Sequence, residues 1–492
     1  MKSKAASSSF LLVVFLFSCF TRSASAGSAT WNLNPTSGDW NTAANWTPAV
    51  VPNGSADVAT FGVSNLTAVS TSADTTVGSI VFNPGASAYT ITTSTGLGLH
   101  FDAGITNNSG VAQTFVNTGG AYDFSFAGFS TSTAGTETFF TGGVVFRSFA
   151  TAGSGTFTAP GGTVSGGFAE QILFFDRTNA ADGTFYINGS EFADPNTAGV
   201  IAFEKISSAG NATITLGAGV NGGSGGHMIL FDGATGGTAR VIFEGNGYLD
   251  ASPDTRLVLT LGSIEGAGRV TLGAVNLSLG TNNLSTTFTG LIEDGLFGSG
   301  GAITKTGSGT LTLSGANTYT GATTVSAGAM KVANKTGSAT GTGAVKVDAG
   351  TMGGPGTISG SVTIGTGNGA GAFLESSVGA SKPTKLTIQS MLTCKADATY
   401  TYKLNTKKAK ADQVVANGVT IESGAQFNLA AIGNKKLNAG TSFTALNNTA
   451  ATPINGTFAN LVDGSTVTVG NNSYQVSYSG KDGNDLTLTV VP

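Results

Sequence analysis

The sequence is poor in charge. Charged residues make up 10% of its 492 residues, against about 25% in an average globular protein. The formal net charge is −4. Because nucleic-acid binding needs a basic face that displaces counterions from phosphates, this composition argues against nucleic acid as a partner. One basic stretch is expected to be a solvated turn, with contact to an anionic surface as the alternative; its lysines are Lys403, Lys407, Lys408 and Lys410.

Histidine and cysteine are almost absent, with two residues of each. His100 and His227 lie far apart in the sequence, and neither belongs to an HExxH motif or lies near a cysteine pair. Nothing therefore indicates a zinc site. No Walker-type GK[ST] segment follows a suitable strand, so a nucleotide site is not indicated either. We expect no metal and no cofactor, with calcium left open.

Long apolar runs are absent except near the N-terminus, where residues 10–17 follow two lysines and precede an Ala-Ser-Ala triplet at 24–26. This order is typical of a secretory signal peptide, and the run is far shorter than the ~20 residues that span a bilayer. We predict a signal peptide at 1–26 and a secreted or cell-surface mature chain without a transmembrane span. Its only cysteine would be Cys394, so no intrachain disulfide could form. A lipid anchor at Cys19 is the alternative.

Glycine, by contrast, is abundant: its 74 residues are about twice the usual share. Hydrophobic residues make up 40% of the chain and include 30 phenylalanines, which is too much apolar side chain for a disordered polymer. Apolar residues alternate with Gly, Thr, Ser and Asn in short runs, and helical periodicity is almost absent beyond the signal peptide. The pattern predicts an all-β chain of short strands joined by tight turns.

A repeat of about 28 residues runs through the middle of the chain. Similar seven-residue segments recur with steps of 28, 29 and 27 residues, at 151–157, 179–185, 208–214 and 235–241. A second landmark is a phenylalanine followed by an acid, at Phe175-Asp176, Phe203-Glu204 and Phe231-Asp232. A unit of this size cannot bury its apolar side alone, so the copies are expected to stack as rungs.

Stacked rungs with parallel strands indicate a right-handed parallel β-helix, with rungs about 4.8 Å apart. Glycine is frequent because each rung turns corners that require positive φ. We predict an N-terminal cap at 27–80, a β-helix at 81–375 that contains a distinct repeat at 301–332, and a C-terminal β region at 376–492.

Residues 305–332 resemble the autotransporter-associated β-strand repeat, which combines a G-x-G-T-L-x-L-x-G stretch with N-T-Y-x-G, T-T-V and G-x-L-x-V segments. Ala322 replaces a glycine of that pattern, and Met330 stands where leucine is common. The matching residues are Lys305, Gly309, Thr310, Leu311, Leu313, Gly315, Asn317, Thr318, Tyr319, Gly321, Thr324, Val325, Gly328 and Val332.

This resemblance implies a secreted bacterial β-helix of the passenger type, with the shape of pectin-lyase-like proteins, and it does not imply catalysis. Autotransporters also carry a membrane barrel of amphipathic strands. The mixed β sequence at 376–492 lacks that pattern, so we expect no translocator in this chain.

The acids of the second landmark are the sharpest candidate for chemistry. If each 28-residue step is one rung, the carboxylates of Asp176, Glu204 and Asp232 stack about one strand spacing apart. Like charges at that distance raise a pKa or share a calcium ion, and polysaccharide-cleaving enzymes use such groups. The favoured interpretation is nevertheless a row of solvated acids helped by Arg147 or Arg177. We therefore assign no catalytic residue.

All three tryptophans lie close together in the sequence, at Trp31, Trp40 and Trp46. The open end of a β-helix needs a cap, because its unpaired strand would otherwise template aggregation, and bulky aromatics serve that purpose. The alternative is a carbohydrate-binding platform, since flat indoles fit the faces of sugar rings.

These observations favour a non-enzymatic β-solenoid that acts as a structural or adhesive surface protein. Its expected partners are polysaccharides or other cell-surface components. A carbohydrate-binding module is the first alternative and a polysaccharide-degrading enzyme the second.

Overall fold

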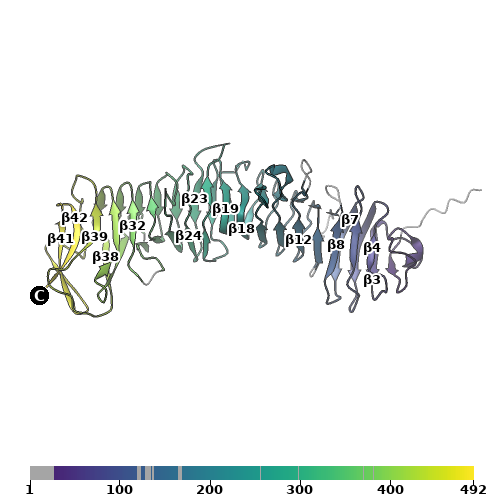
Figure 1. Cartoon of the computed structure of the whole chain (residues 1–492), viewed down its shortest axis with the longest axis horizontal. Helices are drawn as coiled ribbons and strands as arrows, with labels where there is room; N and C mark the ends of the chain where they lie inside the picture. Colours follow the sequence, from purple (N-terminus) through teal and green to yellow (C-terminus); the bar gives the residue numbers. More distant parts are fainter. Residues whose placement is uncertain are drawn as a thin grey trace, which may run out of the picture.

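The protein is an elongated rod of stacked β-strands (Figure 1). The computed structural model describes residues 27–118, 124–127, 135, 138–163, 169–254, 256–296, 298–369, 371–379 and 382–492. The predicted signal peptide at 1–26 lies outside the described residues. In the described part of the chain, no helix has the length and apolar character needed to cross a membrane.

The described residues form strands and two short 3-10 helices, η1 (Ala43–Asn45) and η2 (Pro195–Thr197). The first strands are β1 (Ala29–Trp31), β2 (Trp46–Thr47), β3 (Gly54–Phe61), β4 (Ala68–Ser70), β5 (Thr75–Phe82), β6 (Thr90–Thr93), β7 (Leu99–Asn107), β8 (Gln113–Asn117), β9 (Phe124–Phe126), β10 (Thr138–Thr141), β11 (Val144–Phe146), β12 (Thr156–Ala159), β13 (Gln171–Phe174) and β14 (Thr184–Ile187). The middle strands are β15 (Val200–Phe203), β16 (Thr213–Leu216), β17 (His227–Leu230), β18 (Gly236–Asp250), β19 (Val258–Thr271), β20 (Asn276–Leu279), β21 (Thr286–Phe288), β22 (Leu291–Glu293), β23 (Ala302–Lys305), β24 (Thr310–Leu313), β25 (Thr323–Val325), β26 (Ala329–Val332), β27 (Val345–Val347) and β28 (Gly350–Gly353). The last strands are β29 (Thr357–Ile358), β30 (Val362–Ile364), β31 (Ala372–Leu374), β32 (Lys385–Ile388), β33 (Leu392–Cys394), β34 (Ala398–Asn405), β35 (Lys410–Ala411), β36 (Gln413–Ala416), β37 (Val419–Ile421), β38 (Gln426–Ile432), β39 (Ser442–Asn448), β40 (Thr466–Val469), β41 (Asn472–Gly480) and β42 (Asp485–Val491).

Parallel pairing between successive rungs builds the rod, so the predicted parallel β-solenoid is confirmed. One column of strands runs β8–β10–β12–β14–β16–β18, and a second runs β7–β9–β11–β13–β15–β17. In the first column Phe157 pairs with Phe185, Phe185 with Ile214, and Ile214 with Val241. These are the steps of 28, 29 and 27 residues that the sequence repeat predicts. The right-handed, pectin-lyase-like form stays a prediction.

The interior of the rod is built from identical side chains stacked rung on rung. Each strand alternates inward and outward positions, as in β12 and β14, so every second residue is buried. Because the strands are parallel and in register, one residue type repeats along the interior. Phe146, Phe174 and Phe203 form such a column, with ring centroids 4.5 and 4.8 Å apart. Parallel rings at this spacing gain both burial and stacking energy.

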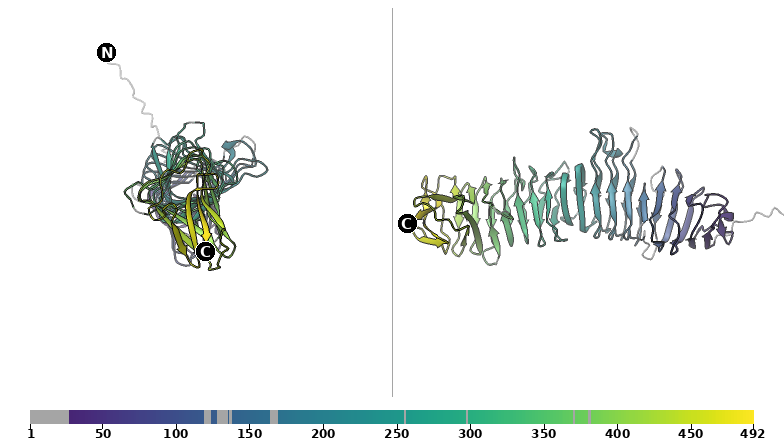
Figure 2. Two further views of the ribbon diagram at one scale, coloured as in Figure 1. Left: turned by 90° about the vertical axis from the view of Figure 1, so that its left-hand side faces the viewer. Right: turned by 60° about the horizontal axis from the view of Figure 1, so that its bottom comes forward.

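The two ends of the solenoid differ from its shaft. At the N-terminal end β1 pairs antiparallel with β2 and parallel with β3. Near the C-terminal end a further face of parallel strands, β29–β32–β36–β39, continues into the antiparallel strands β42, β41 and β40. Figure 2 shows the C-terminal strands closing the rod, seen end-on at left. The predicted domain limits stay predictions, and parallel pairing runs through both inner limits, in β3–β5–β7 and β31–β34–β38.

The basic stretch forms an exposed turn between β34 and the short antiparallel strand β35. Lys407, Lys408 and Lys410 are exposed, and Lys403 forms an ion pair with Glu375. The expected solvated turn is therefore confirmed.

We predict that Phe174→Ala destabilises the solenoid by about 3–5 kcal/mol, because it opens a void between two stacked rings and removes their contacts. The matched control is Phe139→Ala on β10, whose side chain points outward with 42% exposure and should cost far less. Urea denaturation of both variants measures the difference. Equal losses would contradict the stacked interior.

Candidate ligand-binding site

The acids of the predicted row do not stack on one another. Phe174 pairs with Phe203, and Phe203 pairs with Leu230. One residue further on, Glu204 is therefore equivalent to Phe175 and Phe231, and the residue equivalent to Asp176 and Asp232 is Lys205. The prediction of stacked carboxylates is wrong. Its equal steps of 28 residues overlook the real steps of 29 and 27, which shift Glu204 by one position.

The true row alternates in charge at a corner of the solenoid. Asp176, Lys205 and Asp232 share a left-handed backbone, with φ of 58°, 58° and 42°. Lys205 Nζ donates to Asp176 Oδ1 at 2.6 Å, and this bond holds the pKa of Asp176 below its ordinary value. Burial raises the pKa of Glu204, and the nearby Asp232 carboxylate adds to that effect.

This arrangement supplies neither a carboxylate pair for hydrolysis nor a set of ligands for calcium. In the part of the chain that the structure describes, no three His, Cys, Asp or Glu side chains lie together as metal ligands would. The lysine between the two aspartates instead serves as a surface counter-charge. An exposed pair of this kind contributes about 0–1 kcal/mol to stability.

The three tryptophans are buried at the N-terminal end of the solenoid. Trp31, Trp40 and Trp46 are 2%, 0% and 1% exposed, and they surround Phe61 with ring centroids 5.5–6.1 Å from it. Each indole N–H donates to a backbone carbonyl, as Trp40 Nε1 does to Pro52 at 3.0 Å. No indole face is left on which a sugar ring could stack. The cluster instead fills the first rungs in the way expected of a cap.

The repeat motif at 305–332 supplies inward residues and corner contacts. Leu311, Leu313, Val325 and Val332 point into the core of β24, β25 and β26. Asn317 joins three rungs: its Oδ1 accepts from the backbone N–H of Ile292 at 2.8 Å, and its Nδ2 donates to the carbonyl of Ala339 at 2.6 Å.

Two further motif residues depend on the closeness of neighbouring rungs. The buried hydroxyls of Tyr319 and Thr323 lie 2.6 Å apart within hydrogen-bonding distance. A Cβ on Gly315 would lie 1.8 Å from the carbonyl oxygen of Gly290, so no larger residue fits there. The motif is therefore explained by packing, and it contributes no chemistry.

Lys305 is the one charged member of the motif, and its side chain is buried. Its Nζ donates to the carbonyls of Thr306, Gly307 and Ala327, which lie on two successive rungs. Burial lowers the pKa of the ammonium to about 8. The lysine thus satisfies corner carbonyls that would otherwise be unpaired inside the solenoid.

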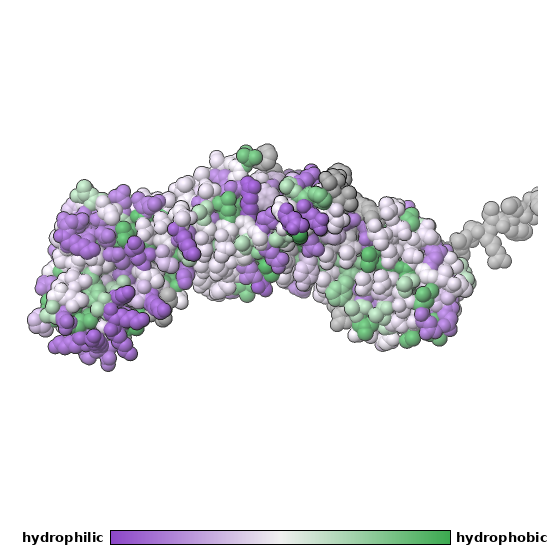
Figure 3. All heavy atoms as spheres, viewed as in Figure 1, coloured by the Kyte–Doolittle hydropathy of each residue, from purple (hydrophilic) through white to green (hydrophobic). Residues whose placement is uncertain are grey.

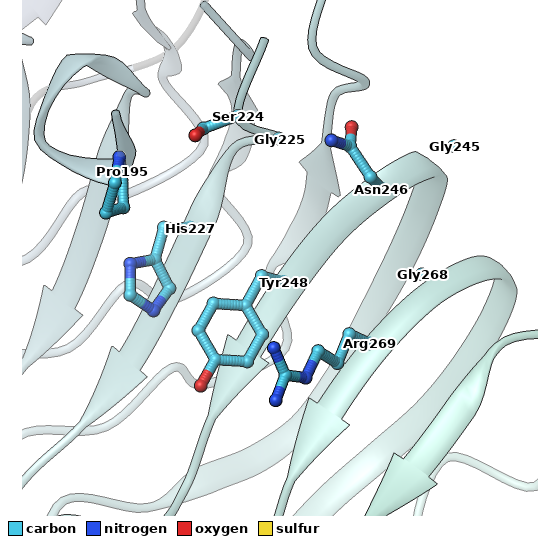
Figure 4. A pocket seen from close by; sticks show the side chains of 9 residues that line it. All are labelled: Pro195, Ser224, Gly225, His227, Gly245, Asn246, Tyr248, Gly268 and Arg269. Carbon is cyan, nitrogen blue, oxygen red and sulfur yellow. The ribbon is translucent and has the colours of Figure 1, made fainter. Parts of the chain in front are cut away.

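A cavity of about 550 Å³ lies on the outside of the shaft, between loops that extend from successive rungs. Pro195 of η2, Ser224, and Asn246 with its neighbouring glycines form its loop walls. His227 of β17, Tyr248 of β18 and Arg269 of β19 form the wall nearest the sheet (Figure 4). Figure 2 at right shows loops that project from this part of the rod.

The sheet wall of the cavity is a stack of flat side chains. His227 pairs with Tyr248 and Tyr248 with Arg269 in the parallel register. The two rings are 4.5 Å apart at 21°, and the Arg269 guanidinium lies 5.5 Å from the Tyr248 centroid. Such a column combines ring stacking with a cation–π contact.

The cavity wall carries polar atoms but little net charge. Arg269 forms an ion pair with Glu293 on the next rung. Burial lowers the pKa of His227 to about 4, although the Asp250 carboxylate acts in the opposite direction, so the imidazole is neutral at pH 7. Burial also raises the pKa of the Tyr248 phenol. His227 Nε2 is buried and has no hydrogen-bond partner among the described residues.

Sequence reasoning missed this cavity because its residues come from three separate rungs. One local signal exists, the stretch G-G-S-G-G-H at 222–227, which has the letters of a serine nucleophile motif. Ser224, however, lies in a loop of the solenoid rather than between a strand and a helix. Since His227 Nε2 has no hydrogen-bond partner, Ser224 and His227 do not form a catalytic pair in this structure.

Comparison with known proteins identifies the repeat. Residues 303–332 match the model of the passenger-associated-transport-repeat. No curated protein matches the chain. Among solved structures, the crystal structure of the Haemophilus influenzae Hap adhesin is similar with 10% identity and a TM-score of 0.26, over 88% of this chain and 64% of that one. At this level the structural likeness supports no argument.

The fold and the family match together define the class. The chain is a parallel β-solenoid that carries an autotransporter-type passenger repeat. The resemblance inferred from the motif is confirmed over 303–332.

We predict that Lys305→Met lowers the stability of the solenoid by about 1–3 kcal/mol, because it leaves corner carbonyls without a donor. Lys331→Met on β26 is the matched control, since that side chain occupies an outward position of the same repeat. Denaturation midpoints of both variants test this. A Lys305→Met protein as stable as the wild type would show that the buried ammonium has no stabilising role.

The depressed pKa of His227 predicts a pH dependence of stability. Between about pH 6.5 and pH 4 the unfolded chain binds a proton at this residue and the folded chain does not, so stability falls as the pH drops through that window. The loss attributable to His227 is at most about 3 kcal/mol. Unfolding of wild type and His227→Gln at several pH values measures it. The expected result is a shallower acid loss in the variant, and identical slopes would contradict the assignment.

Proposed function

We propose that the protein is a secreted or cell-surface, non-enzymatic β-solenoid that acts as a structural and adhesive rod. The observation that carries this proposal is the passenger-type repeat at 303–332 inside a continuous parallel solenoid. A solenoid of this kind provides length and a large lateral surface, which suit contact with extended partners.

The outer surface supports the same proposal. Outward rows of threonine follow the shaft, as in Thr156, Thr184 and Thr213, and provide hydrogen-bonding groups without charge. Much of the shaft is of intermediate hydropathy, while strongly hydrophilic residues gather over the C-terminal end of the face shown in Figure 3. Such a wall favours hydroxyl-rich polymers and other weakly charged surfaces as partners.

Catalysis receives less support from the geometry. The acids that suggested a polysaccharide-degrading enzyme are separated by Lys205 or displaced by one position. The tryptophans that suggested a carbohydrate-binding platform are buried. Neither alternative therefore retains the residues on which it was based.

Export and adhesion test the proposal together. We expect a protease added to intact cells to digest the full chain but not a variant that lacks residues 1–26. We also expect beads coated with purified protein to retain producing cells or their surface polysaccharide. An intracellular full chain, or coated beads that retain no more material than uncoated beads, would contradict the proposal.

The non-enzymatic part has a separate readout. The triple variant Asp176→Asn, Glu204→Gln, Asp232→Asn should retain adhesion, and the wild type should leave the length of surface polysaccharides unchanged during incubation. Size-exclusion chromatography of the polymers measures this. Shortening by the wild type and not by the triple variant would establish an enzyme.

A further inference from the structure

The cavity beside β17, β18 and β19 has the features of a built ligand site. Its volume of about 550 Å³ lies within the range of ~300–1,000 Å³ usual for small-ligand pockets. We infer that this cavity binds a short segment of an uncharged saccharide chain. The inference rests on the proposed function, because it names the chemistry through which an adhesive solenoid would hold a surface polymer.

The walls of the cavity are held in place by hydrogen bonds between loops. Asn246 Oδ1 accepts from the backbone N–H of Gly219 at 2.8 Å, and its Nδ2 donates to the carbonyl of Gly223 at 2.9 Å. On the opposite loop, Thr197 Oγ1 donates to Ser190 Oγ at 2.9 Å in a buried contact. Because the loops are tied to one another, a ligand meets a largely formed site and little ordering is needed for binding.

The polar groups that line the cavity suit hydroxyl groups. Ser224 and Asn246 lie on the loop side, and the edges of the flat stack lie on the sheet side, as Figure 4 shows. The faces of Tyr248 are covered by its neighbours His227 and Arg269, so a ligand meets the rim of the ring rather than its face. A saccharide hydroxyl both donates and accepts, which allows it to pair with groups of either kind around such a rim.

His227 provides the strongest indication of a missing partner. Its Nε2 is buried and unpaired among the described residues, although it belongs to a residue that lines the cavity. A buried polar atom without a partner costs about 1–3 kcal/mol, so a ligand hydroxyl that reaches it recovers free energy. The same loss explains why a ligand without a hydrogen-bonding group is a poor fit.

The charges around the cavity favour an uncharged ligand. Arg269 is the one cation among the lining residues, and the Glu293 carboxylate already neutralises it. The Asp250 carboxylate acts on both His227 and Tyr248 and would repel an acidic sugar. A uronic acid or a phosphate would therefore bring a charge that the site does not balance.

Calorimetric titration of the purified full chain tests this inference. The probes are neutral hexasaccharides of glucose, mannose and galactose, and hexagalacturonate is the acidic counterpart. We expect at least one neutral hexasaccharide to bind and the acidic one to bind at least about tenfold more weakly. Absence of binding by every neutral probe, or equal affinity for hexagalacturonate, would overturn the inference.

Two variants locate the binding. His227→Phe preserves a flat ring in the stack and removes both ring nitrogens, and Ser224→Ala removes one hydroxyl on the loop side. Each should weaken binding of the neutral probe by about tenfold, the effect of losing one hydrogen bond. Tyr186→Ala on β14 is the control, since Tyr186 is 45% exposed and does not line the cavity.

Affinity unchanged in both cavity variants would place the site elsewhere and overturn the inference. Should His227→Phe fail to fold, as judged by circular dichroism, Ser224→Ala carries the test alone. The bead assay separates this result from the proposed function. Retention of cells without any hexasaccharide binding leaves the adhesive function standing and removes the saccharide cavity, and binding without retention does the reverse.

Discussion

Parallel, in-register hydrogen bonding between successive rungs is the constraint on which the rest of this structure depends. It places each residue directly over its equivalent in the preceding rung, so that a favourable contact is repeated along the rod. The phenylalanine column of β11, β13 and β15 is one result, because each inward position receives the same ring at stacking distance. The glycine at position 315 is another, since the preceding rung leaves no room for a Cβ.

The same constraint makes the corners sensitive to single residues. The strands tolerate rungs of 27 to 29 residues because the excess is absorbed in turns, but a side chain near a turn changes its neighbours when the count changes. Lys205 rather than Glu204 thus lies over Asp176 and forms an ion pair with it. A row of like charges becomes a row of alternating charges, which a parallel stack accommodates at much lower electrostatic cost.

The ends and the loops are where the chain departs from repetition. Three buried indoles fill the first rungs, and antiparallel strands close the last ones, so that the exposed edges of the parallel columns are limited. The candidate cavity has a similar origin. Loops longer than a simple corner extend from neighbouring rungs, and they enclose a space beside the stacked side chains of His227, Tyr248 and Arg269. A solenoid can acquire such a site without altering its core, because the core depends on the strands and the site depends on the turns.

The sequence by itself determined the all-β class, the parallel rungs, the steps of the first repeat and the passenger-type motif. Regular spacing of small and apolar residues leaves stacked strands as the way to bury the apolar side of every unit. Only the tertiary structure decided which charges meet at the corners, that the tryptophans are buried, and that residues 195, 227, 248 and 269 share a cavity. These features depend on the number of residues in each turn and on contacts between loops of different rungs. A repeat period averages over both.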